Sequence, residues 1–147
     1  MPQSNPIKGI EAFLAETIQV SDRILVVYLF GSFLGESQKR TSDIDLAFLI
    51  NEKRYVSDSV QAVSPAFLIA AKLGMVLDKE TDVTVLNSAS LEIAYEVITT
   101  GRCIYEVEPE RRFEYESKMR GMYFDFRPFI EQLRAESMNR LSLKKSG

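Results

Sequence analysis

The residues of this 147-residue chain best placed to do chemistry are two aspartates, Asp43 and Asp45, at the head of an apolar run. That run, residues 46–50, is short and rich in β-forming residues, which predicts a buried strand. Side chains at positions i and i+2 of a strand point to the same face, so the two carboxylates lie roughly 6.6 Å apart along it. Adjacent like charges on a buried strand are unfavourable unless cations neutralise them. The pair therefore indicates a site for hard divalent cations and the phosphates that accompany them.

A glycine and a serine, Gly31 and Ser32, follow an earlier apolar run at residues 24–30 and precede Asp43 by a ten-residue gap. Glycine lets the backbone approach a ligand closely, and a serine hydroxyl can donate a hydrogen bond to a phosphate oxygen. Residues 33–36 predict the start of a short helix, whose first N–H groups attract an anion. An Asp-x-Asp is common in loops and a Gly-Ser in turns, but their conjunction beside two strands favours a functional site.

The composition restricts the chemistry further, because the chain has no histidine and one cysteine. It can therefore form neither a Ser-His-Asp or Cys-His site nor a histidine-based zinc site. Metal chemistry must use oxygen ligands, which indicates magnesium, with manganese as an alternative. The net charge of −3 leaves no basic surplus, so we expect no direct nucleic-acid role.

The single cysteine, Cys103, lies in a predicted strand and is interpreted as a small buried hydrophobe. A chain with one cysteine cannot form an internal disulfide, which fits a reducing cytoplasm. Residues 1–6 are polar and show no signal peptide. No apolar stretch approaches 18 residues without a charge, so we expect no membrane span and a cytoplasmic location.

The elements that must position these residues follow from the apolar periodicity. It predicts helices over 7–20, 57–73, 91–100 and 111–143 and strands over 24–30, 46–50, 82–87 and 102–107. Residues 51–56 are charged and predict a loop, Pro65 and Pro128 predict kinks, and Gly74 predicts a helix end. This order predicts an α/β (α+β) fold with a small mixed β-sheet flanked by helices, which we place on one side of the sheet. The aromatic stripe of the last helix is expected to pack mostly on the sheet, and one domain is expected over residues 1–147.

The pattern Gly31-Ser32…Asp43-Ile44-Asp45 resembles the nucleotidyltransferase superfamily related to DNA polymerase β. The resemblance implies a polymerase β-like catalytic core over about residues 7–107, followed by a C-terminal helical segment over about 109–143. It also implies a third carboxylate on a later strand. Asp82 fits this position because it opens the β-branched run of residues 82–86, whereas Asp78 and Glu80 precede the run.

The resemblance implies roles for individual residues. Asp43 and Asp45 would hold two Mg²⁺ ions, and Asp82 would bind only the ion near the attacking hydroxyl and help to deprotonate it. Gly31 and Ser32 would hold the β- and γ-phosphates of ATP. Either Lys39 or Arg40 could reach the triphosphate, although solvated loop charges are the commoner role for such residues.

The acceptor is also implied by resemblance. Residues 96–106 and 123–128 look like the minimal nucleotidyltransferases of the MNT type, the MntA-like antitoxins paired with HEPN-domain toxins. This family implies an ATP- and magnesium-dependent protein adenylyltransferase, which moves AMP to a tyrosine of a HEPN ribonuclease toxin and so neutralises it. One departure is that residues 33–36 lack the basic residue, followed by glycine, that many relatives carry after the serine.

Two other functions remain open. One is a small-molecule nucleotidyltransferase of the aminoglycoside-modifying type. An acidic patch that gathers a cationic antibiotic would favour it, and the candidate residues for that patch are Glu106, Glu108, Glu110, Glu114 and Glu116. The other is an antitoxin that neutralises its toxin by binding without catalysis. Three intact aspartates argue against this last function, because a cluster of like charges needs a use.

Overall fold

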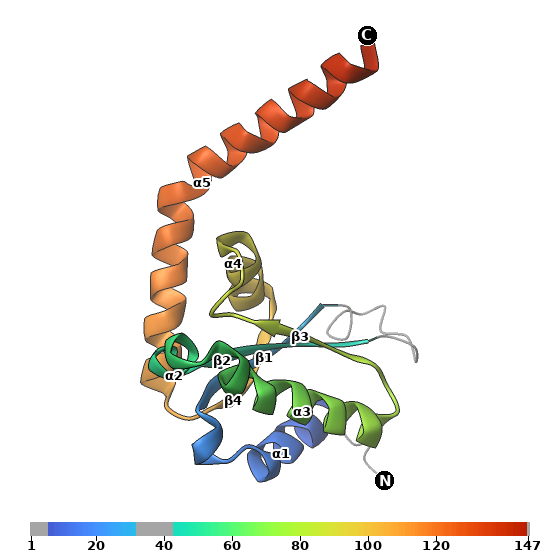
Figure 1. Ribbon diagram of the computed structural model, residues 1–147, viewed down its shortest axis with the longest axis vertical. Helices are drawn as coiled ribbons and strands as arrows, with labels where there is room; N and C mark the ends of the chain where they lie inside the picture. Colours follow the sequence, from blue (N-terminus) through green and yellow to red (C-terminus); the bar gives the residue numbers. More distant parts are fainter. Residues whose placement is uncertain (1–5, 32–42, 147) are drawn as a thin grey trace.

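The computed structural model describes residues 6–31 and 43–146, and its ribbon is drawn in Figure 1. Five helices, one short 3₁₀ helix and four strands make up the described part of the chain. In chain order they are α1 (Pro6–Thr17), η1 (Val20–Asp22), β1 (Ile24–Phe30), β2 (Ile44–Ile50), α2 (Glu52–Ser57), α3 (Ser59–Leu77), β3 (Thr81–Val85), α4 (Leu91–Thr100), β4 (Arg102–Glu106) and α5 (Pro109–Ser146).

The strands form one mixed sheet, as the sequence predicts, and its strand order is β3-β2-β1-β4. Strand β1 pairs antiparallel with both β2 and β4, while β2 and β3 are parallel. The parallel pair requires a crossover, and α3 supplies it. The two central strands are almost completely buried, because both faces of their apolar runs are covered.

Helices cover both faces of the sheet, so the expectation of helices on one side is wrong. Helices α1 and α3 cover one face, and α4 with the first part of α5 covers the other (Figure 1). The cause lies in β1, where Val27 and Leu29 enter one core cluster and Val26 and Tyr28 enter the other. Successive residues of a strand face opposite sides, so a strand that is apolar at every position must be covered twice.

Helix α3 is longer than predicted and is not interrupted by its proline. It begins after Asp58, whose side chain accepts a hydrogen bond from the Gln61 N–H, and it continues through Pro65 to Leu77. The predicted end at Gly74 is wrong. A Cβ on Gly74 would stand 2.7 Å from the Lys79 carbonyl oxygen, so the glycine allows the chain leaving the helix to pass close by.

The segment between β2 and α3 also differs from its prediction. Residues 52–57 are not a loop but the short helix α2, which is capped by the Asn51 side chain accepting from the Arg54 N–H. At the far side of the sheet, the predicted strand over 82–87 ends early, at Val85. Its extension is replaced by the Asn87 side chain, which hydrogen-bonds to both the N–H and the carbonyl of Ile50.

Helix α3 is long and apolar enough to cross a membrane by length and composition alone, which the sequence reading did not anticipate. Its inner side carries Ala66, Ile69 and Leu73, which are buried in the core formed with α1 and the sheet. Its outer side also carries exposed apolar residues, among them Phe67, Leu68 and Met75, so burial in the core accounts for only part of its apolarity.

Helix α5 is one continuous helix of 38 residues with Pro128 inside it. Figure 1 shows that it bends partway and that its later part runs away from the body of the molecule. Tyr115 and Met119, in its first part, pack against the sheet, whereas Phe129 and Leu133 are exposed. The expectation that most of its aromatic and apolar stripe packs on the sheet is therefore wrong beyond the bend.

Candidate functional site

Three predicted site residues, Asp43, Asp45 and Asp82, meet at one end of the sheet. Asp43 immediately precedes β2, Asp45 is the second residue of β2, and Asp82 is the second residue of β3. Because these two strands are parallel and pair Ile44 with Thr81, Asp45 lies directly beside Asp82. The β-branched residues around Asp82 form a strand against β2, and this pairing brings together carboxylates 37 positions apart in the sequence.

The pKa of Asp45 reflects its burial and the nearby carboxylates of Asp82 and Asp43. The pKa of the Asp45 carboxyl is raised, first by burial and then by the charge of Asp82, by a hydrogen bond with Asp82 and by the charge of Asp43. Among residues 6–31 and 43–146, no ion pair joins any of the three aspartates to a lysine or arginine. The cluster is thus a group of carboxylates that forms none of the ion pairs found among residues 6–31 and 43–146.

The donor chemistry of this cluster fits a hard divalent cation, because all its ligating atoms are carboxylate oxygens. Within the described residues, no three His, Cys, Asp or Glu side chains are yet gathered closely enough to hold a metal ion by themselves. Magnesium sites usually combine one or two carboxylates with substrate phosphates, so a closed cluster of three protein ligands is not required. Asp43, Asp45 and Asp82 are therefore the residues that could hold such an ion together with a phosphate substrate.

Gly31 belongs to the same site for a reason that sequence reasoning missed. It follows β1, and the register pairs its neighbour Phe30 with Asp45. A Cβ on Gly31 would stand only 2.2 Å from Asp45 Oδ2, and the backbone there has a φ of +82°, which side chains other than glycine rarely adopt. The glycine thus leaves space for the Asp45 carboxylate. No spacing rule reveals this contact, because it depends on the pairing of β1 with β2.

The other predicted phosphate contacts fall outside the described residues. Ser32, Lys39 and Arg40 lie within 32–42, and so does the short helix expected over 33–36. Of the rival carboxylates, Asp78 ends α3 in a left-handed conformation with a φ of 52°. Glu80 contributes its carbonyl, which accepts a hydrogen bond from the Ile44 N–H and so joins β3 to β2.

Two of the five acidic residues considered for an antibiotic-binding patch make contacts within the fold. Arg112 pairs with Glu106 at 2.5 Å and with Glu116 at 3.3 Å, and Tyr28 donates a hydrogen bond of 2.9 Å to Glu116. Glu116 is only 7% exposed. Two of the five glutamates are therefore held within the fold, which weakens the case for an open acidic surface that gathers cations.

Comparison with known proteins also indicates a nucleotidyltransferase. Residues 13–110 match the family described as polymerase beta, nucleotidyltransferase. The protein adenylyltransferase MntA of Shewanella oneidensis is 31% identical over 88 residues, which are 60% of this chain and 58% of that relative. The match thus spans less than two thirds of the relative's length.

Solved structures share the fold over nearly the whole chain. A toxin–antitoxin crystal structure with AMP-PNP superposes with a TM-score of 0.67 at 24% identity, covering 91% of this chain and 99% of that chain. A tri-AMPylated Shewanella oneidensis HEPN toxin in complex with MNT antitoxin superposes with a TM-score of 0.64 at 21% identity, covering 90% of this chain and 98% of that chain. Likeness at this identity concerns the fold, and the family match covers more than half of the chain. With its aspartates gathered at one end of a mixed sheet, this chain belongs to the polymerase beta nucleotidyltransferase family.

Proposed function

We propose that this chain is an antitoxin enzyme that transfers AMP from ATP to a tyrosine of a cognate HEPN-domain ribonuclease toxin and thereby neutralises it. The observation that carries the proposal is the pairing of Asp45 with Asp82, beside Asp43, in a cluster that forms none of the ion pairs found among the described residues. The name of the Shewanella relative and the AMPylated toxin in a structurally similar complex support the choice of AMP and of a protein acceptor.

In this proposal the three aspartates have distinct roles. Asp43 and Asp45 would hold two Mg²⁺ ions, or Mn²⁺ in their place, and Asp82 would hold only the ion nearest the attacking hydroxyl. When bound, such ions would neutralise the charge that develops on the oxygens of an in-line displacement. Gly31 and Ser32 would bind the β- and γ-phosphates of ATP, and Lys39 or Arg40 would contact the triphosphate.

The reaction forms one bond to phosphorus and breaks another. The phenolic oxygen of the acceptor tyrosine bonds to the α-phosphorus of ATP, while the bond from that phosphorus to the oxygen bridging the β-phosphate breaks. Pyrophosphate leaves with that electron pair, and the phenolic proton passes to Asp82. The toxin then carries a bulky anion that opposes RNA binding. A cytoplasmic location follows from this proposal, because the toxin acts on cellular RNA.

The test is intact-mass spectrometry of the cognate HEPN protein after incubation with this chain, ATP and magnesium. We expect a mass gain of one or more AMP units with the natural chain and none with Asp43→Asn/Asp45→Asn. Asp78→Asn is the matched control, because it removes a carboxylate close by and asparagine tolerates the left-handed conformation found there. It should keep the mass gain.

Other results would assign other functions. No mass gain, with the toxin silenced equally by the natural chain and the double variant, would mean neutralisation by binding alone. Neither mass gain nor silencing would redirect the search to small-molecule acceptors. A mass gain that survives in the double variant would remove the aspartates from the mechanism.

A further inference from the structure

Strand β3 lies at an edge of the sheet, because the strand order is β3-β2-β1-β4. It is five residues long, and in the described sheet it pairs with β2 alone, so one short parallel ladder sets its position. Asp82 is its second residue and lies beside Asp45 of β2. The separation of these two carboxylates therefore depends on the first residues of a short edge strand.

The two carboxylates oppose this arrangement. After burial, the charge of Asp82 is the largest cause that raises the pKa of the Asp45 carboxyl, which means that the two ionised side chains disfavour each other. Like charges side by side on neighbouring strands are destabilising. In the absence of a cation, their repulsion therefore pushes the beginning of β3 away from β2.

Thr81, the residue before Asp82, opposes this repulsion from the other face of the strand. Its hydroxyl donates a hydrogen bond of 3.0 Å to the carbonyl oxygen of Ala70 in α3, in a partly buried setting. Successive side chains of a strand face opposite sides, so this bond restrains β3 from the side of α3 while the Asp82 carboxylate lies on the other side. Ala70 is itself part of the buried core, so the point of attachment is fixed.

Two further features hold the same point of the chain. A Cβ on Gly74 of α3 would stand 3.3 Å from Thr81 Cγ2, so the glycine leaves room for the threonine to lie close to the helix. Immediately before Thr81, the Glu80 carbonyl accepts a hydrogen bond of 2.9 Å from the Ile44 N–H of β2. The beginning of β3 is thus held between α3 and β2 directly before Asp82.

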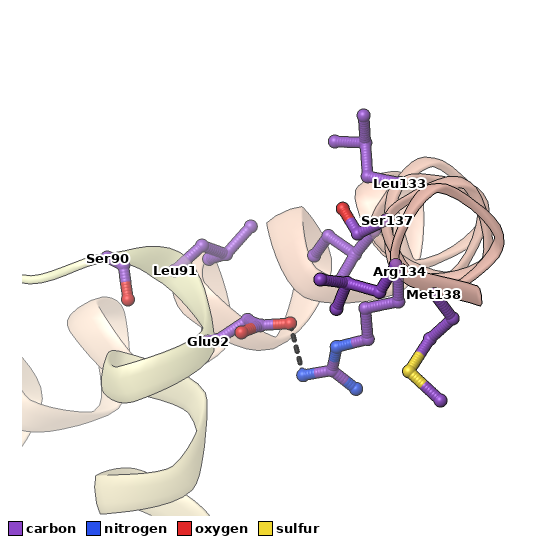
Figure 2. Close-up of a pocket in the computed structure, with 9 residues that line it drawn as sticks. Ser90, Leu91, Glu92, Leu133, Arg134, Ser137 and Met138 are labelled. Carbon is purple, nitrogen blue, oxygen red and sulfur yellow. Dashed lines mark hydrogen bonds and ion pairs between the residues drawn. The ribbon is translucent and has the colours of Figure 1, made fainter. Parts of the chain in front are cut away.

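An ion pair elsewhere in the molecule shows why the threonine is well suited to this task. Glu92 of α4 and Arg134 of α5 join their helices, as Figure 2 shows, but these side chains are 42% and 67% exposed. An exposed pair of long side chains contributes little and is screened by salt. The side chain of Thr81 is short and stiff, and its hydrogen bond is partly shielded from water, so it restrains the backbone more closely.

We infer that Thr81 is a positioning residue for the candidate active site: its hydrogen bond to Ala70 holds Asp82 beside Asp45 against their mutual repulsion, so that the two carboxylates are in place before a divalent cation binds. This inference rests on the proposed function, because it takes Asp82 as a ligand of Mg²⁺. It adds a residue that does not itself contact the ion but sets how completely its site is formed beforehand.

The test is hydrogen exchange of the peptide covering residues 81–85, followed by mass spectrometry in metal-free buffer at neutral pH. Thr81→Val keeps the branched side chain but removes the hydroxyl, and it should raise the exchange rate about tenfold. In the Asp45→Asn background, where the repulsion is absent, the same change should raise the rate only about threefold, because the two contacts are coupled. Thr81→Ser keeps the hydroxyl and should exchange at nearly the natural rate.

Two control variants separate this effect from a general loss of contacts. Thr84→Val makes the same change in the same strand, at a hydroxyl that is not hydrogen-bonded among the described residues. Glu92→Gln weakens the exposed pair with Arg134, far from β3 in the sequence. Both should leave the exchange of residues 81–85 unchanged.

The consequence for the reaction is measured through its dependence on magnesium. Thr81→Val should raise the Mg²⁺ concentration that gives half-maximal AMP transfer to the HEPN protein about tenfold, while the maximal rate stays nearly natural. The reason is that part of the binding energy of the ion must then be used to bring Asp45 and Asp82 together. Intact-mass kinetics over a series of magnesium concentrations measures both quantities.

The outcomes distinguish the positioning role from the proposed reaction. An equal rise in exchange in the natural and Asp45→Asn backgrounds would make Thr81 an ordinary structural contact and overturn the inference, and so would an unchanged magnesium requirement. Coupled exchange without AMP transfer by any form, the natural chain included, would support the positioning role and overturn the reaction. A Thr81→Val chain that unfolds alone but folds in the Asp45→Asn background would support the role, and unfolding in both backgrounds would overturn it.

Discussion

Two clusters of carboxylates, one between strands β2 and β3 and one between strand β4 and helix α5, differ in what surrounds them. Glu106 and Glu116 share the guanidinium of Arg112, and Glu116 also accepts a hydrogen bond from the buried Tyr28 hydroxyl. Asp45 faces Asp82 with no basic side chain paired to either among residues 6–31 and 43–146, and the pKa of its carboxyl is raised.

This difference separates a structural cluster from a candidate site. Buried charges that are paired within the fold hold elements together, here the sheet and α5. Carboxylates that repel one another reduce stability unless an external cation joins them, so their presence suggests a function that uses that cation. The comparison predicts that changes in the aspartate cluster lower activity, while changes in the glutamate cluster lower stability.

The largest effect is expected from Asp45→Asn. It removes a proposed metal ligand, and we expect the rate of AMP transfer to fall on the order of a thousandfold, as several kcal/mol of charge stabilisation are lost. Single-turnover mass spectrometry with saturating ATP and magnesium measures the rate. Retention of even a tenth of the natural rate would contradict the comparison.

Gly31→Ala should act on the same cluster indirectly. Its Cβ would require Asp45 to move, because the carboxylate oxygen stands 2.2 Å from that position. A displacement of this size is expected to reduce AMP transfer about a hundredfold. Gly9→Ala is the matched control, since a Cβ at Gly9 meets nothing within 4 Å. Equal activity of the two alanine variants would show that Gly31 does not position Asp45.

Glu116→Gln should lower the stability of the protein and leave its activity unchanged. It weakens the contacts with Arg112, Arg120 and Tyr28 in a setting where Glu116 is only 7% exposed. We expect the free energy of unfolding to fall by about 2 kcal/mol, with AMP transfer by the folded protein unchanged. Urea denaturation followed by circular dichroism measures the loss. The exposed Glu131→Gln, which breaks only a surface pair with Arg127, should change stability little.

The pH dependence of stability should also distinguish the clusters. The raised pKa of Asp45 means that the folded protein binds a proton there more readily than the unfolded chain does. In metal-free buffer Asp45→Asn should therefore melt at a higher temperature than the natural protein at neutral pH. The gap should close as the pH falls through the folded pKa, which lies above the ordinary value of 3.8. A difference in melting temperature that grows as the pH falls would contradict this prediction.

The reactivity of Cys103, beside the glutamate cluster, tests the comparison without a change in activity. Burial, and then the charge of Glu106, raises the pKa of its thiol from 9.0 to about 11. The folded protein should therefore react with iodoacetamide at pH 8 about a hundredfold more slowly than the same chain in denaturant. Mass spectrometry of timed samples follows this reaction. Equal rates would mean that the thiol is neither buried nor affected by Glu106.

Much of the fold could be predicted because the signals are local. The apolar runs at 24–30 and 46–50 and the helix over 91–100 are found where predicted, since their periodicity and their flanking residues act within a few positions. One error arises where a distant contact decides the outcome: the Asn87 side chain, which hydrogen-bonds to Ile50, takes the place of the last predicted strand residues. The errors at Gly74 and at residues 52–57 involve contacts within five positions, which the apolar pattern does not reveal.

The sequence by itself determined which residue types could do chemistry here: three aspartates, a glycine beside a serine, and no histidine, which together restrict the chemistry to oxygen ligands and phosphate. Tertiary structure decided which of these residues meet. The parallel register of β2 and β3 places Asp82 beside Asp45, and the pairing of β1 with β2 places Gly31 against the same carboxylate. Periodicity describes the contacts that a residue makes within its own element, whereas strand register arises from the packing of the whole core.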